Sequence, residues 1–470
     1  MLNKTKNLGQ IYTPAHIVND ILNLVDYSGE KILQKHIIDN SCGNGAFLQE
    51  IIEKYISAYK VQHGSLLGVE SELSKYIHGI EIDKEEFIKC RDNLDKLIFW
   101  QGLTDVDWDI KNADTLTVKD YDLKMDYVVG NPPYVRIHNL QDNFYKIRDY
   151  NFCKNGMVDL FIVFYEIGFK MLNSNGKLCY ITPNSFYSSE AGKHFREFII
   201  NSKHLYHVID LGHYQPFKAT TYTTICAFDN AQTFDNINYS IYTKDGKIQF
   251  EEELKVIEAF NNGKMILAKK REQEFLKDIV NYIPQNKNLL QVKNGFATLS
   301  DPIFIKDSFE FSNTIDILKA STGAWKKCVF PYDKQSKALP FENLNGECKK
   351  YLLQNKIKLM DRSIDKGSDW YVFGRSQAIS DVYKNKIAIN TTIKNIKSIK
   401  INFVKKGQGI YSGLYILTDF SIKTIENIIK TQDFIDYVST LGKCKSGGYF
   451  AFSSKDLKQY LIYKLEGLNE

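Results

Sequence analysis

Residues 130–134 read Gly-Asn-Pro-Pro-Tyr and directly follow an apolar run. Proline donates no backbone hydrogen bond and excludes helix, and a residue that precedes proline is extended. Asn131 and Pro132 both precede a proline, so the loop should be stiff. It presents the Asn131 side-chain oxygen and the Pro132 carbonyl as two fixed hydrogen-bond acceptors. Two such acceptors suit the two N–H hydrogens of a planar amine, and Tyr134 adds a flat surface beside it.

A second group of residues has the spacing of a nucleoside site. Gly43 and Gly45 follow an apolar strand and precede a helix, where glycine permits a tight turn and a close ligand. The loop is not a phosphate-binding GxxxxGK[ST] loop. Glu81 ends the next strand, where a carboxylate can accept both hydroxyls of a ribose. Asp114 comes next and can take an adenine amino group, and Asp39 can meet an ammonium group.

One acid for a ribose and one for an adenine, without a phosphate cradle, indicate S-adenosylmethionine as the cofactor. The acceptor of its methyl group would be an exocyclic amine. Bonds to Asn131 and Pro132 would localise the lone pair of that amine and stabilise the positive charge that develops on nitrogen. A base inside a duplex cannot reach such a loop, so it must flip out.

The elements that position these residues alternate between strand and helix over the first half of the chain. The strands expected around residues 36–39, 77–82 and 125–130 are separated by helical stretches, which predicts a mostly parallel sheet with helices on both faces. A polar stretch after about residue 230 indicates a domain junction. We therefore expect a catalytic domain over residues 1–235 and a second domain over residues 245–470.

The net charge also differs between the two halves of the chain. Residues 241–470 carry 37 Lys and Arg against 26 Asp and Glu, whereas residues 1–240 carry 24 against 30. A basic second half fits a polyanionic partner, although a solvated lysine-rich surface gives the same count. The eight cysteines form no CxxC pair, which argues against zinc and for a reducing compartment. No metal site, membrane span or signal peptide is expected.

The motif order resembles the gamma-type N6-adenine DNA methyltransferases of bacterial restriction–modification systems. The resemblance rests on GQIYTPAHIVNDIL, DNSCGNGAFL, GIEID, NAD, GNPPY and HYQPFKATTYTTICAF, in that order. It implies a catalytic loop made by Asn131, Pro132, Pro133 and Tyr134. It implies cofactor contacts from Thr13, Asp39, Asn40, Cys42, Gly43, Gly45, Glu81, Ile82 and Asp114. It also implies that Phe217 stacks on the flipped base opposite Tyr134.

The same resemblance implies a class I methyltransferase fold, a Rossmann-like α/β fold with a seven-stranded and mostly parallel sheet. A C-terminal target-recognition domain of mixed α+β structure would follow it. The function implied is site-specific transfer of a methyl group from S-adenosylmethionine to adenine N6 in double-stranded DNA. The protein would be a cytoplasmic, nucleoid-associated monomer, and its system implies a separately encoded cognate restriction endonuclease.

Three alternatives keep the fold and change the target. Asn-Pro-Pro-Tyr also occurs in enzymes that methylate amines of RNA bases or glutamine side chains of proteins, and N4-cytosine in DNA is a further candidate. A basic domain of about 230 residues after the catalytic one favours nucleic acid. A fused nuclease is not expected, because the motifs begin near residue 9.

Overall fold

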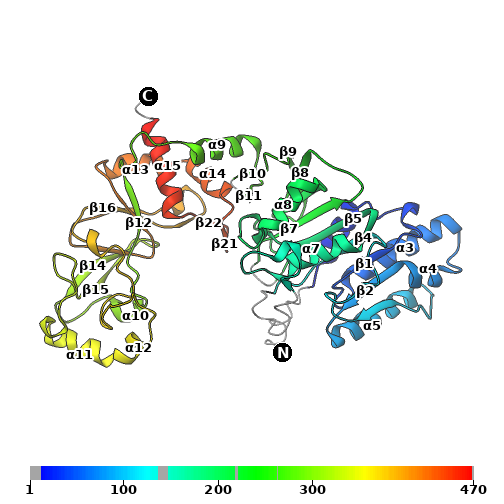
Figure 1. Cartoon of the computed structure of the whole chain (residues 1–470), viewed down its shortest axis with the longest axis horizontal. Coiled ribbons are helices and arrows are strands. Elements are labelled where there is room, and N and C mark those ends of the chain that lie inside the picture. The colour runs from blue at the N-terminus through cyan, green and yellow to red at the C-terminus, as the bar shows by residue number, and fades with distance from the viewer. Residues whose placement is uncertain (1–11, 136–146, 218–220, 262, 468–470) are drawn as a thin grey trace. The chain divides into compact units, whose positions relative to one another are not determined.

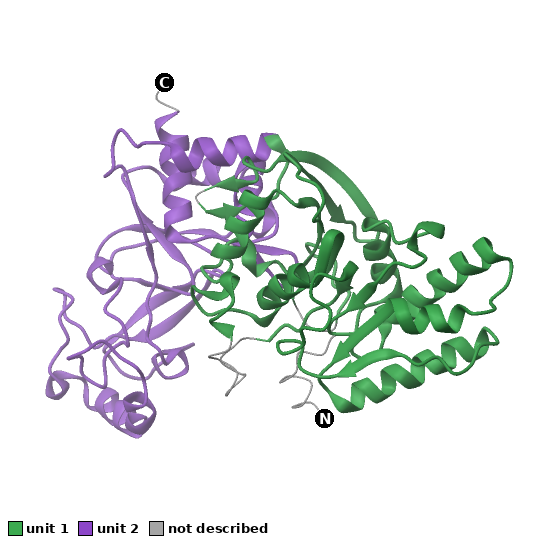
Figure 2. Cartoon of the chain, turned by 45° about the vertical axis from the view of Figure 1, so that its right-hand side comes forward, with its two compact units in different colours: residues 1–270 green, residues 271–470 purple. Residues whose placement is uncertain are grey.

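The computed structural model describes residues 12–135, 147–217, 221–261 and 263–467. The chain divides into two compact units, residues 1–270 and residues 271–470 (Figure 2). Hydrophobic clusters of buried side chains fill each unit separately. Each unit is therefore described by itself.

The first unit runs from blue to green in Figure 1. Over its described residues it is built on a nine-stranded sheet with the order β3-β2-β1-β4-β5-β7-β6-β8-β9. Its strands are β1 (Ile37–Asp39), β2 (Ile77–Glu81), β3 (Asp109–Asn112), β4 (Met125–Gly130), β5 (Leu172–Pro183), β6 (Leu205–Asp210), β7 (Thr223–Asp229), β8 (Asn236–Tyr242) and β9 (Ile248–Lys255). The pairs from β3 through to β5 are parallel, and β7 runs antiparallel to both β5 and β6. The predicted parallel core is present, within a mixed sheet.

Helices cover both faces of this sheet. The helices are α2 (Ala15–Leu24), α3 (Ala46–His63), α4 (Val69–Tyr76), α5 (Lys84–Trp100), α7 (Leu160–Met171) and α8 (Lys193–Ser202), with the short turns η1 (Glu30–Ile32), η4 (Asn151–Cys153) and η5 (Asn184–Tyr187). Buried residues of α2 to α5 share one hydrophobic cluster, and those of α7 and α8 share another. Successive residues of β1 alternate between the clusters, since Ile37 belongs to the first and Ile38 to the second.

The sheet differs from the expected seven strands because β8 and β9 extend it beyond β6. β8 pairs in parallel with β6, and β9 pairs antiparallel with β8. β8 alternates exposed and buried positions only over its first four residues, and β9 is exposed along most of its length, as an edge strand is. Such short and partly polar strands resemble a linker in the sequence. The expected boundary at residues 235–245 accordingly falls inside the first unit, which also contains β10 (Phe260–Asn261) and β11 (Lys264–Met265).

The second unit mixes short strands and helices, as an α+β domain does. Its described residues form a sheet β12-β20-β16-β18, a sheet β13-β15-β14-β19 and a smaller sheet β17-β22-β21. The strands are β12 (Gln291–Asn294), β13 (Ile305–Lys306), β14 (Thr314–Lys319), β15 (Ala324–Val329), β16 (Lys386–Ile389), β17 (Thr392–Ile393), β18 (Ile401–Val404), β19 (Gly409–Tyr411), β20 (Leu414–Leu417), β21 (Cys444–Lys445) and β22 (Tyr449–Ala451). The helices are α9 (Lys270–Asn281), α10 (Asp301–Phe304), α11 (Gly346–Gln354), α12 (Lys356–Met360), α13 (Ile422–Ile429), α14 (Gln432–Thr440) and α15 (Ser454–Glu466), with η6 (Phe341–Asn343), η7 (Ile379–Asp381) and η8 (Ile396–Ser398).

Candidate active site at the carboxyl ends of the strands

Four parallel strands end side by side at one edge of the large sheet. β1 ends at Asp39, β2 at Glu81 and β4 at Gly130, while Asp114 follows shortly after β3. Asp39 is the register partner of Val129 in β4. Ligands of open α/β sheets bind at this edge, because the loops there leave room between the strand ends. The topology therefore gathers the predicted acidic residues on the side of the sheet where a ligand can bind.

Asp39 and Gly130 lie in close contact at the centre of this edge. The Asp39 side chain is almost fully buried and accepts a hydrogen bond from the Ser41 backbone N–H at 3.0 Å. A Cβ atom placed on Gly130 would lie 2.6 Å from Asp39 Oδ1, so only glycine fits there. Burial raises the pKa of Asp39 to about 7, despite the Ser41 hydrogen bond. A buried carboxylate of this kind is stabilised by a nearby cation.

The glycine loop and Glu81 hold one another in place. The Gly43 N–H donates to Glu81 Oε2 at 2.9 Å, and the Asp83 N–H donates to Oε1 at 2.7 Å. Burial raises the pKa of Glu81, although these two backbone hydrogen bonds act in the opposite direction. Each carboxylate oxygen has a second lone pair. Glu81 is thus fixed by the backbone and can still accept hydroxyl hydrogens.

Three other residues of the predicted cofactor loop support it from inside. Asn40 is fully buried, and its side-chain oxygen accepts from the Tyr180 hydroxyl at 3.0 Å. The Cys42 side chain is buried, and contact with Cys90 together with burial raises the pKa of its thiol. Gly45 has φ +90°, and a Cβ there would lie 2.9 Å from the Cys90 sulfur. The structure places the side chains of Asn40 and Cys42 in the interior, where they hold the loop.

Ile82 and Asp114 are more open to solvent. The Ile82 side chain is 56% exposed, although it directly follows a buried strand. Asp114 is half-buried and accepts the Leu116 N–H at 3.0 Å. Ile82 follows β2 and Asp114 follows the neighbouring strand β3. An exposed aliphatic side chain and a half-buried carboxylate in these places can receive one face and the amino edge of a purine.

The predicted catalytic loop is tied to the beginning of the described chain. The Asn131 side-chain nitrogen donates to the Thr13 hydroxyl at 3.0 Å, across 118 positions of sequence. Thr13 is buried and precedes α2. The Ser41 hydroxyl donates to the Asn131 carbonyl at 3.4 Å. Because the nitrogen of the carboxamide is held by Thr13, the orientation of its oxygen is set as well.

Tyr134 and Phe217 are brought together from loops far apart in sequence. Their ring centroids lie 6.4 Å apart with an interplanar angle of 78°, an edge-to-face contact. The Tyr134 hydroxyl donates to the Ile181 carbonyl at 3.3 Å, and burial raises its pKa. Between Asn131 and Tyr134, Pro132 is buried and Pro133 is half-buried. Residues 9–11 and 218–220 of the two flanking motifs lie outside the described residues.

Two residues of this edge were not singled out from the sequence. Tyr180, in β5, binds Asn40 across 140 positions, and no local pattern could reveal such a pair. Asp210 ends β6 as Asp39 ends β1, and burial raises its pKa to about 6 despite a hydrogen bond from the Gly212 N–H at 2.8 Å. A carboxylate that ends a strand was a visible signal, but no neighbouring motif drew attention to it.

Comparison with known proteins connects this arrangement to a class of enzymes. Residues 52–217 match the Eco57I restriction-modification methylase family. The type II restriction enzyme and methyltransferase RM.Eco57I of Escherichia coli is 24% identical, in an alignment that covers 95% of this chain and 56% of that protein. The type II methyltransferase M.BstVI of Geobacillus stearothermophilus is 28% identical, over 50% of this chain and 44% of that protein. The chain thus spans about half the length of these relatives.

The fold has solved counterparts as well. The type IIL restriction-modification enzyme MmeI, solved in complex with DNA, superposes with a TM-score of 0.60 at 13% identity, over 93% of this chain and 63% of that one. The predicted resemblance to methyltransferases of restriction–modification systems is therefore confirmed. The same matches imply S-adenosylmethionine as the cofactor.

The residues at the strand ends fit that cofactor. The buried Asp39 carboxylate, with its raised pKa, suits an ammonium group. Gly43 has φ +53° and open space where a side chain would stand.

In the described part of the chain, no group of three or more His, Cys, Asp or Glu side chains is placed to bind a metal ion. Every helix among the described residues is too short or too polar to serve as a transmembrane span.

Proposed function

We propose that the protein is a site-specific DNA methyltransferase that transfers a methyl group from S-adenosylmethionine to N6 of a flipped-out adenine. The proposal rests above all on the Asn-Pro-Pro-Tyr loop at the carboxyl end of β4, directly beside Asp39. This loop would present two hydrogen-bond acceptors near the carboxylate that suits the ammonium of the cofactor. The enzyme would act as the modification component of a restriction–modification system.

The roles of the residues follow from their places in the site. Asp39 would bind the ammonium group of the cofactor, Glu81 its ribose hydroxyls and Asp114 the amino group of its adenine, with Ile82 against the ring. Asn40, Cys42 and Gly45 would shape the loop around it. When bound, the cofactor supplies an electrophilic methyl group on a sulfonium.

The catalytic loop acts on the target amine. The Asn131 side-chain oxygen and the Pro132 carbonyl accept its two N–H hydrogens, which localises the nitrogen lone pair. They also stabilise the positive charge that nitrogen gains during transfer. Pro133 keeps the loop stiff. Tyr134 and Phe217, which contact each other edge to face, would turn and separate to take the flipped base between them. Water accepts the proton released afterwards, so no histidine base is needed.

DNA as the substrate is supported by the second unit and by the relatives. Residues 271–470 carry 31 Lys and Arg against 21 Asp and Glu. We assign target recognition to this unit and methyl transfer to the first. A monomer that works in the bacterial cytoplasm, beside a separately encoded endonuclease, completes the proposal.

The decisive experiment is modification mapping. The protein is expressed in a bacterial host that lacks its own DNA methylation, and the genome is sequenced by a method that detects modified bases directly. We expect N6-methyladenine confined to one short sequence, and none with the Asn131→Ala variant. N4-methylcytosine instead would change the target base. Unmodified DNA in cells that contain folded, cofactor-binding protein would overturn the proposal and move the target to RNA or protein.

A further inference from the structure

One stretch of the second unit is rich in lysine and free of acidic residues. Residues 382–418 contain seven lysines and no Asp or Glu. These lysines are Lys384, Lys386, Lys394, Lys397, Lys400, Lys405 and Lys406. The stretch contains β16, β18 and β20, three neighbours in one sheet. The stretch also contains β17 and β19, which belong to the two other sheets of the unit. Positive charge is therefore concentrated in one stretch of the second unit.

The antiparallel pairing of β16 with β18 separates these lysines into two groups. Lys386 is the register partner of Val404, so residues 382–385 and 405–408 meet at one end of the pair. There the Gly407 N–H donates to the Val382 carbonyl at 2.9 Å. The Lys406 N–H donates to the Asn385 side chain at 3.1 Å. We call residues 382–385 and 405–408 the basic loop pair.

Lys384, Lys405 and Lys406 of the basic loop pair are exposed. Lys397 and Lys400 are equally exposed, but they lie in and after η8, toward the opposite end of the two strands. The two groups have the same chemistry in different places. The second group therefore provides a matched comparison for the first.

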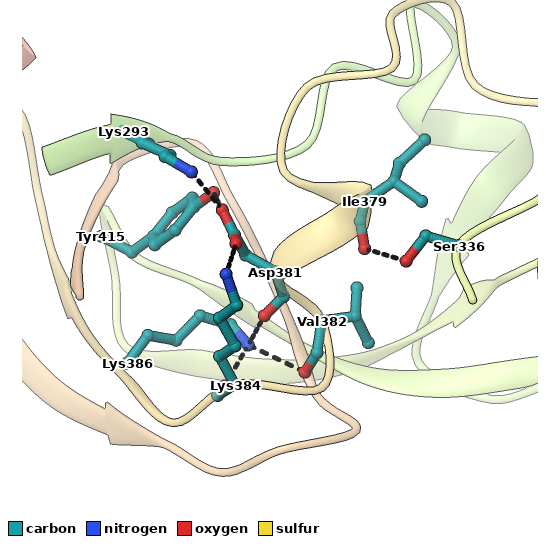
Figure 3. Close-up of polar contacts among 8 residues, drawn as sticks. All are labelled: Lys293, Ser336, Ile379, Asp381, Val382, Lys384, Lys386 and Tyr415. Atoms are coloured by element: carbon teal, nitrogen blue, oxygen red, sulfur yellow. Dashed lines mark hydrogen bonds and ion pairs between the residues drawn. The ribbon is translucent and has the colours of Figure 1, made fainter. Parts of the chain in front are cut away.

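A buried carboxylate anchors the basic loop pair (Figure 3). The Asp381 side chain is 2% exposed, and its Oδ1 accepts from Lys384 Nζ at 2.8 Å. Its Oδ2 accepts from Lys293 Nζ at 2.7 Å and from the Tyr415 hydroxyl at 2.8 Å. Burial alone would raise the pKa of Asp381, but these hydrogen bonds outweigh it and lower the pKa to about 2. Asp381 therefore carries a negative charge at neutral pH.

A buried lysine fixes the backbone of the same loop. Lys386 Nζ donates to the carbonyls of Asp381 and Val382 at 3.0 Å and to that of Lys384 at 2.9 Å. Lys386 is 4% exposed, and burial lowers its pKa to about 8. Three carbonyls within four residues are thus turned inward toward one ammonium group, which holds the loop in one conformation (Figure 3).

Burying these charged groups contributes little net stability to the fold. Buried charges lose their hydration, and apolar residues of similar size are often at least as stabilising. What this arrangement achieves is a rigid surface loop with surplus positive charge. Among the described residues, Asp381 is the one acidic side chain that forms an ion pair with any of five nearby lysines. These are Lys293, Lys384, Lys386, Lys405 and Lys406. Each ammonium group has three donors, so Lys384 can bind an anion without leaving Asp381.

We propose that the basic loop pair is a docking surface for the sugar–phosphate backbone of duplex DNA. It would contact phosphates in a fixed geometry and hold the duplex in place without reading bases. This proposal rests on the proposed function, in which DNA is the substrate. It assigns part of the DNA-binding affinity of the protein to Lys384, Lys405 and Lys406.

The test is the salt dependence of DNA binding. Equilibrium affinity is measured over a range of salt concentrations with two duplexes, one with the sequence found by modification mapping and one without it. Each phosphate contact contributes about 0.9 to the slope of log affinity against log salt. The Lys405→Gln, Lys406→Gln double variant should therefore lower the slope by about 2 on both duplexes. The Lys397→Gln, Lys400→Gln double variant should leave it unchanged.

Three results would overturn the inference while methylation of DNA stands. The slope could be unchanged in the first variant, or it could fall equally in both variants. The first variant could also reduce the preference for the specific duplex, which would make these lysines base-reading residues. All four lysines are exposed, so circular dichroism and thermal unfolding should show folded protein in each case. A wild-type protein that neither binds nor methylates DNA would instead refute the proposed function itself.

Discussion

At the scale of single residues, the hydrogen bond between Asn131 and Thr13 has the most direct consequence for catalysis. A carboxamide has an acceptor end and a donor end, and only the acceptor end can bind an amine hydrogen. The Thr13 hydroxyl takes the donor end at 3.0 Å. Thr13, which the motifs place with the cofactor contacts, thereby becomes a candidate for positioning the catalytic amide.

Replacing Thr13 separates these two roles. Thr13→Val should lower kcat about fivefold, since one hydrogen bond contributes about 1 kcal/mol. The affinity for S-adenosylmethionine should change little, and Thr13→Ser should restore kcat. Single-turnover methylation and calorimetry measure the two quantities. A large loss of cofactor affinity with normal kcat would assign Thr13 to the cofactor instead.

The raised pKa of Asp39 predicts a pH dependence with a definite sign. Burial raises the pKa of Asp39 in the folded protein to about 7, well above the value of about 3.9 for an unperturbed Asp side chain. The folded state therefore holds this proton more tightly, and the charged carboxylate costs stability as pH rises between these values. The free energy of unfolding of Asp39→Asn should exceed that of the wild type by an amount that grows from pH 4.5 to pH 7 and then levels.

Cofactor binding should show the opposite trend. An ammonium group binds the ionised form of Asp39, so wild-type affinity for S-adenosylmethionine should rise between pH 5.5 and pH 7.5. Asp39→Asn should bind weakly, with a flat profile. Calorimetry in buffers of matched ionic strength measures the affinity of both proteins for S-adenosylmethionine against pH. If the two affinities change with pH in the same way, Asp39 does not bind the ammonium group.

At the scale of elements, the end of β4 determines how closely the catalytic loop approaches the acid at the end of β1. Gly130 has φ +155°, and a Cβ there would meet Asp39 Oδ1 at 2.6 Å. No other residue fits without moving either the carboxylate or the loop. The two predicted motifs therefore depend on one another through this single glycine.

Gly130→Ala should reduce cofactor affinity at least tenfold and should destabilise the protein. Gly102→Ala is the control, because Gly102 has φ +76° with nothing within 4 Å of a Cβ. The control should show only the backbone cost, about 1–2 kcal/mol, with normal cofactor binding. Denaturant unfolding and calorimetry measure both. Equal effects of the two substitutions would show that the contact with Asp39 is unimportant.

How much the sequence could predict varies from element to element. The strand ends at Asp39 and Glu81 were predictable, because apolar runs followed by glycine or acid mark them. β8 and β9 were not, since short and partly polar strands resemble a linker. The Asn131–Thr13 and Asn40–Tyr180 bonds join residues more than a hundred positions apart, beyond any local pattern. Strands of two to six residues hid the architecture of the second unit.

At the scale of the whole molecule, two separate cores predict two separable unfolding events. The clusters around α2 to α8 lie in residues 1–270, and those around α11 and β16 lie in residues 271–470. S-adenosylmethionine should raise the midpoint of one transition only, because a ligand stabilises the unit that binds it.

A core substitution in the second unit identifies the transitions. Leu352, fully buried in α11, can be replaced by alanine at a cost of about 2–5 kcal/mol. Leu352→Ala should lower the transition that the cofactor leaves unmoved. Differential scanning calorimetry with and without the cofactor measures both effects. If cofactor and substitution shift the same transition, the two units unfold as one.

The edge strand β9 bears on how copies of the protein behave at high concentration. An open sheet edge presents unpaired backbone groups that another chain can join, which is a route to aggregation. Here that edge carries three consecutive glutamates, residues 251–253. Glu251 pairs with Lys269, and its neighbours Glu252 and Glu253 accept hydrogen bonds from Lys270 and Asn236. Two such edges would bring like charges together, so the glutamates that tie β9 to its own fold also discourage its growth into fibrils.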